Sequence, residues 1–89
     1  MLARAQSDAL ERWPRALLAF LQGRLTANDF LGEARGAGQQ TEAHAYIGIS
    51  AGIAGRPDEA RHHLSWVRDR GVRTSAEYDM SRVELARLD

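Results

Sequence analysis

Apolar residues recur every three or four positions along most of this chain, which is typical of amphipathic α-helices. Glycine and proline residues interrupt the pattern and divide it into segments. We therefore expect a succession of helices over approximately residues 2–12, 14–22, 26–36, 41–54, 57–71 and 74 to the end. Val and Ile are scarce beside Ala, Leu, Arg and Glu, so we predict an all-α fold with no strand.

Particular residues mark where these helices should begin and end. Pro14 lacks a backbone donor, so it should end the first helix and open the second. Thr26, with Asp29 three residues later, is a predicted N-cap, and Gly-Ala-Gly at residues 36–38 should stop the helix that follows it. The other predicted boundaries are the helix ends at Gly23, Gly55 and Gly71, the helix start at Pro57 and a capping box from Thr74 to Glu77.

The 34 residues from Thr41 to Thr74 place small and apolar side chains on both sides of one Gly/Pro turn, which describes a helical hairpin. In length and pattern this stretch resembles a tetratricopeptide repeat (TPR), a helix-turn-helix unit. His44 departs from the family's usual aromatic residue, and Val72 stands where a proline often follows the repeat. The residues that match the pattern are His44, Ile47, Gly48, Ala51, Ala60, Leu64 and Val67.

A weaker match precedes this repeat, since Gly23, Ala27, Leu31 and Ala34 resemble the turn and second helix of another one. The resemblance implies a single TPR-like domain over residues 1–89 of antiparallel helical hairpins, about two repeats plus a capping helix. Its parts would be an N-terminal helix (1–13), a degenerate repeat (14–36), the best repeat (41–74) and the capping helix (75–89). Pairs such as Trp13-Pro14 and Glu77-Tyr78 are also similar to the C-terminal part of a bacterial TPR protein.

The resemblance implies a non-catalytic protein–protein interaction module, an adaptor or scaffold, with a protein or peptide partner or with itself. Family members bind ligands on the concave face lined by the first helix of each repeat. Carried over by position, this face consists of Glu42, Ala45, Ile49, Gly52 and Ile53. These residues are mostly small and apolar, which suits a nonpolar segment. The alternative is that they pack against Tyr78, Val83 or another helix of the same chain.

Composition narrows the function further. The 89 residues contain 12 acidic and 12 basic side chains, so no overall field favours nucleic acid or an anionic membrane. The absence of Cys excludes disulfides and thiol nucleophiles. The longest apolar run, residues 16–21, is too short to span a bilayer, and residues 1–10 do not resemble a signal peptide. We expect a cytoplasmic protein.

Adjacent histidines, His62 and His63, follow Asp58 and Glu59 by one helical turn, a spacing that can pair an imidazole with a carboxylate as metal ligands. The only other imidazole is His44. Adjacent residues point in different directions on a helix, so the interpretation we prefer is acid–histidine pairs on a solvated face. We expect no metal and no cofactor, and a metal-binding helical domain remains an alternative.

Evidence for catalysis or DNA binding is weak. The serines lack a nucleophile-elbow context and no glycine-rich phosphate loop joins a strand to a helix, so we expect no enzyme. A helix-turn-helix DNA-binding regulator is the other alternative. Its recognition helix would span residues 61–73, with Arg61, Arg68, Arg70 and Arg73, but His62, His63 and Asp69 dilute that basic surface.

Overall fold

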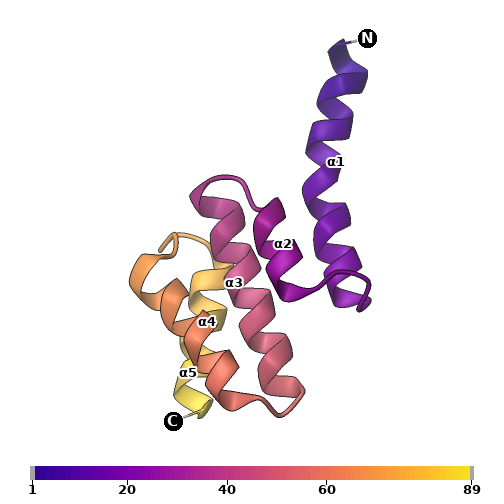
Figure 1. The fold of residues 1–89 in the computed structure, drawn as a ribbon. Coiled ribbons are helices and arrows are strands. Elements are labelled where there is room, and N and C mark those ends of the chain that lie inside the picture. Colours follow the sequence, from indigo (N-terminus) through magenta and orange to yellow (C-terminus); the bar gives the residue numbers. More distant parts are fainter. Residues whose placement is uncertain (1, 89) are drawn as a thin grey trace. The chain divides into compact units, whose positions relative to one another are not determined.

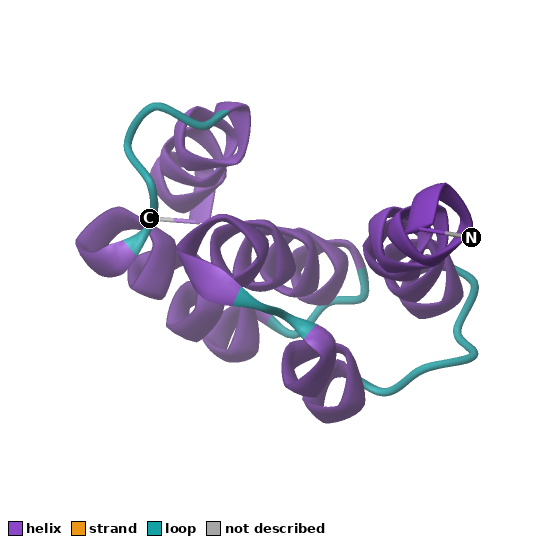
Figure 2. Ribbon diagram, turned by 90° about the horizontal axis from the view of Figure 1, so that it is seen from above, coloured by secondary structure: helices purple, strands orange, loops and turns teal. Residues whose placement is uncertain are grey.

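The computed structural model describes the backbone of residues 2–88 and the side chains of residues 12–88. Throughout these residues the chain is all-α, with helices joined by short loops and no strand (Figure 2). The helices are α1 (Leu2–Leu21), α2 (Ala27–Glu33), α3 (Gly36–Ile53), α4 (Pro57–Arg70) and α5 (Ala76–Leu88), labelled in Figure 1. They divide into two compact units, Met1–Ala34 and Arg35–Asp89. The all-α prediction is therefore confirmed.

The first unit is organised around Phe30 of α2, which is fully buried. Its ring lies between Trp13 and Phe20 of α1, with stacked centroids 5.0 Å and 4.8 Å away. Such pairs contribute about 0.5–1.5 kcal/mol each beyond the burial of apolar area. As predicted, Thr26 is the N-cap of α2, and its hydroxyl accepts a hydrogen bond from the Asp29 amide (3.1 Å).

The predicted break at Pro14 is wrong, because α1 is one continuous helix from Leu2 to Leu21 with Pro14 inside it. Proline removes one helical hydrogen bond but holds φ near the helical value, and here the turns on both sides keep the helix intact. The end of α1 follows the prediction. Gly23 has a φ of +76°, and the Arg24 amide donates to the Ala19 carbonyl (2.8 Å) in a Schellman arrangement.

The second unit consists of α3, α4 and α5, which run alternately up and down (Figure 1). Gly55 closes α3 with a φ of +80°, and the Arg56 amide donates to the Ala51 carbonyl (2.8 Å). Pro57 then opens α4 at a first helical position, where its missing donor has no consequence. The predicted helical hairpin is confirmed, including both of its turn residues.

Helices α3 and α4 approach closely because Gly48 has no side chain. A Cβ added at Gly48 would lie 2.6 Å from Cγ and 2.7 Å from Cδ2 of Leu64. Around this contact the core side chains Ile47, Leu64 and Val67 are at most 2% exposed. Small residues therefore set the distance between the two helices, and larger ones fill the remaining space.

Three further boundaries differ from the predictions. The Gly-Ala-Gly segment at 36–38 was predicted to stop the preceding helix, but α2 already ends at Glu33 and residues 36–38 belong to the first turn of α3. Helix α3 begins at Gly36 and not near Thr41, because the Arg35 amide donates to the Gln39 side chain (2.8 Å) and supports an earlier first turn. Helix α5 is capped by Ser75 and not by Thr74, since the Ser75 hydroxyl accepts from the Tyr78 amide (3.1 Å).

Side-chain hydrogen bonds tie the parts of the second unit together. The buried Thr41 hydroxyl donates to the Ala37 carbonyl (2.8 Å) and accepts from the Val72 amide (3.0 Å) in the loop between α4 and α5. The Arg61 guanidinium on α4 donates to the Leu88 carbonyl (2.9 Å) at the end of α5. These contacts position α5 beside the hairpin, where Leu85 completes its core.

Candidate interaction surface

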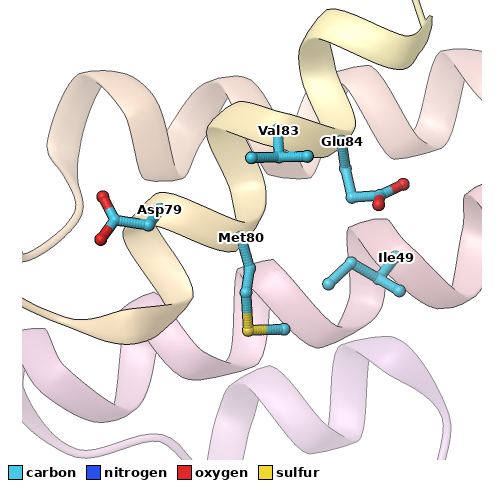
Figure 3. A pocket seen from close by; sticks show the side chains of 5 residues that line it. All are labelled: Ile49, Asp79, Met80, Val83 and Glu84. Atoms are coloured by element: carbon cyan, nitrogen blue, oxygen red, sulfur yellow. The ribbon is translucent and has the colours of Figure 1, made fainter.

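An open apolar cavity of about 410 Å³ lies between α3 and α5. Its apolar lining is Ile49 from α3 with Met80 and Val83 from α5. Figure 3 shows Met80 extending from α5 on the side where Ile49 lies. Val83 is 59% exposed and Met80 39%, so this part of α5 offers apolar side chains to solvent. Clustered exposed apolar residues of this kind commonly mark binding surfaces.

The five residues of the predicted concave face do not form one surface. Ala45 is 0% exposed, so the prediction that it contacts a partner is wrong. Near Ala45 the buried residues of α3 lie on several sides of the helix. Glu42 is partly buried, and Gly52 is exposed beside Ala60 of α4. Ile49 lines the cavity, and Ile53 is 84% exposed at the end of α3.

Sequence reasoning missed the contribution of α5, because it considered Val83 only as a residue against which the predicted concave face could pack. In α5 the inward positions are Ser81, Leu85 and Leu88, spaced at four and three residues. Met80 and Val83, three residues apart, form a second stripe on another side of the helix. Two apolar stripes on one short helix are the signal that could have separated core from surface.

Carboxylates border the cavity. Asp79 and Glu84 line it together with the apolar residues, and Figure 3 shows Asp79 directed away from Ile49. Glu84 forms an exposed ion pair with Arg87 (3.3 Å), which partly neutralises the charge of the Glu84 carboxylate. Asp79 thus gives the rim its acidic character, which favours a ligand that carries a cation beside an apolar group.

A cluster of aromatic rings joins α3 to α4 on another side of the hairpin. Nδ1 of His44 lies 2.9 Å from Nδ1 of His63, and the His44 ring stacks on Trp66 with centroids 4.0 Å apart. His62 is exposed, as a solvated face requires, but His63 is only 8% exposed. The prediction that both histidines lie on a solvated face is therefore wrong for His63, which packs against the opposite helix.

Burial keeps this histidine pair neutral. Burial, followed by the charges of His63 and His62, lowers the pKa of His44 from 6.5 to about 4. Burial and His62 also lower the pKa of His63, although Glu59 partly opposes them. Both rings are thus uncharged near pH 7, the state in which one nitrogen can donate to another.

The acid–histidine pairs expected along α4 are replaced by acid–arginine pairs. Glu59 accepts from Arg56 (2.7 Å) and Asp58 from Arg61 (3.1 Å). Among the side chains of residues 12–88, no three His, Asp or Glu groups come together as a possible metal site. Any metal at these histidines would therefore rest on two protein ligands.

Two of the four arginines of the alternative recognition helix are engaged in similar contacts. Arg61 bonds to Asp58 and to the Leu88 carbonyl, and Arg68 bonds to Asp69 (2.9 Å). These contacts occupy donors that a DNA phosphate would need. In addition, no helix within the described residues has the length and apolar character needed to cross a membrane.

Comparisons with protein-family models, with curated proteins and with solved structures find no match to this chain.

Proposed function

We propose that this chain is a non-catalytic, TPR-like interaction module whose ligand is an amphipathic helix of a partner protein. The observation that carries the proposal is the apolar lining of one open cavity, in which the exposed Met80 and Val83 lie beside the partly buried Ile49. The other interface of α3, against α4, is closely packed and has no room for a ligand. The site on α5 replaces most of the concave face that the repeat resemblance implies.

The chemistry of the cavity describes the ligand. An apolar side chain such as Leu would fill the space beside Met80, a flexible residue that adapts to different shapes. An Arg or Lys one turn away would lie near Asp79 on the rim. Helix-in-groove recognition combines these two elements, with apolar anchors at helical spacing and charges at the edge.

A synthetic amphipathic peptide with a Leu face and flanking Arg residues would test this proposal, with a version carrying Glu in place of Arg. We expect saturable NMR shifts of the Met80 methyl group with the Arg peptide and weaker binding of the Glu peptide. Val83→Asp should reduce affinity at least about tenfold while the far-UV circular dichroism stays unchanged. Gln40→Asp adds the same charge to an exposed position of α3 and should leave binding unchanged.

Other results would overturn the proposal. Shifts that map away from α5, or an equal response of both aspartate variants, would exclude this surface. Size-exclusion chromatography with light scattering tests the remaining occupant. A dimer that Val83→Asp dissociates would identify a second copy of the chain, and not a foreign helix, as the ligand.

A further inference from the structure

The close approach of His44 and His63 is a second feature whose side chains are able to bind a ligand, and it is separate from the α3–α5 cavity. Their Nδ1 atoms are 2.9 Å apart, and their ring centroids are 5.1 Å apart with planes inclined by 36°. In this contact the N–H of one Nδ1 donates a hydrogen bond, and the other Nδ1 accepts it with its lone pair. Two imidazole nitrogens from two helices thus converge on the place of a single shared proton.

The distance between the two Nδ1 atoms decides which metal ion they can bind together. Metal–imidazole bonds are about 2.0–2.1 Å long. With donors 2.9 Å apart, such bonds enclose an angle of about 90° at the metal. That angle belongs to adjacent positions of square-planar or octahedral coordination, whereas a tetrahedral ion needs nitrogens about 3.3 Å apart.

The structure thereby assigns His44 and His63 as a bidentate site for a divalent transition-metal ion of square-planar or octahedral preference, Ni²⁺ or Cu²⁺. On binding, the Nδ1 proton leaves for solvent and Nε2 of the same ring takes up a proton. Both Nδ1 lone pairs then face the ion, with no net proton release. Water fills the other coordination positions, since no third ligand gathers there within residues 12–88.

Three surroundings favour this role. The lowered pKa of both histidines keeps their lone pairs available near neutral pH. Trp66 stacks on His44 with an interplanar angle of 18° and so fixes the orientation of one ligand ring. His44 is only partly buried, which gives an ion from solvent access to the pair.

Trp66 also makes the site observable, because the only other tryptophan in the chain is Trp13. In a Trp13→Phe background, titration with Ni²⁺ should quench the fluorescence of Trp66 to a plateau and raise the melting temperature. Zn²⁺ should bind more weakly. His44→Phe keeps a ring against Trp66 but removes both nitrogens, so it should lose the plateau, whereas His62→Gln at the exposed neighbour should keep it.

The assignment fails if Ni²⁺ gives no saturable quenching up to about 1 mM, or if the His62 variant abolishes the response. It also fails if His44→Phe, folded by circular dichroism, responds like its parent. Should His44→Phe not fold, NMR of the parent chain decides. Selective broadening of His44 and His63 ring signals by Ni²⁺ supports the site, and broadening centred on His62 overturns it.

Discussion

Helix α3 packs against both α4 and α5, which also contact each other, and its two interfaces differ. Toward α4 a glycine brings the backbones close, the core side chains are buried, and two histidines meet across the interface. Toward α5 the contact is less extensive, a cavity stays open, and the buried Ser81 hydroxyl has no hydrogen-bond partner. One interface is closely packed, and the other leaves apolar side chains exposed to solvent.

The largest effect that we expect is the weakening of the α3–α4 interface by acid. The pKa of His44 is about 4 in the folded chain against 6.5 when exposed, so between these values the unfolded chain binds more protons. The contribution of His44 to stability should be fully present above pH 6.5 and be lost as the pH falls toward 4. Because the ring is only partly buried and solvent screens its charge, this loss should be on the order of 2 kcal/mol and not the full value of the shift. Urea unfolding between pH 7 and pH 4 measures this loss.

Carboxylates also titrate near pH 4, so the His44→Phe variant serves as the reference. Its free energy of unfolding should depend less on pH than that of the parent, because one low-pKa imidazole is gone. Parallel pH profiles for the two proteins would contradict the role assigned to the histidine.

Alanine substitutions at Gly48 and Gly52, one turn apart on α3, compare a closely packed position with an open one. Gly48→Ala places a Cβ against Leu64 and should destabilise the fold by about 1–2 kcal/mol, since overpacking outweighs the gain in helix propensity. Gly52→Ala meets only Ala60, at an ordinary 3.8 Å, and should stabilise by up to about 1 kcal/mol. Urea unfolding of both variants gives the comparison, and equal effects would show that α4 retreats freely.

On the α5 side, Ser81→Ala should stabilise the second unit slightly. Ser81 is fully buried and its hydroxyl has no partner, so its removal ends a desolvation penalty and improves helix propensity. We expect a gain of about 0.5–1 kcal/mol in thermal or urea unfolding. A loss would mean that the hydroxyl is satisfied in solution, for example by water.

Local chemistry made much of the fold predictable. Thr26, Gly23, Gly55 and Pro57 act at helix ends as expected, because capping and turn geometry depend on a few adjacent residues. Pro14 was misjudged because a helix that is otherwise favourable tolerates the loss of one hydrogen bond. The prediction of one continuous domain over residues 1–89 stays a prediction.

The surface was less predictable than the fold. Helical spacing placed Ala45, Ile49 and Ile53 on one side of α3, but it could not show that Ala45 is covered. Burial depends on neighbours distant in sequence, and so does the contact of His44 with His63, nineteen residues later. Met80 was missed because the stripe of Met80 and Val83 was not separated from the inward-facing stripe of the same helix.

The Thr41 hydroxyl gives the loop between α4 and α5 an unusual property. The Val72 amide lies outside any helix, yet its donor is bound to a fully buried oxygen on α3. Exchange of this amide hydrogen with the solvent requires the loop to separate from α3. A loop residue thereby belongs to the same cooperative opening unit as the helices on either side of it.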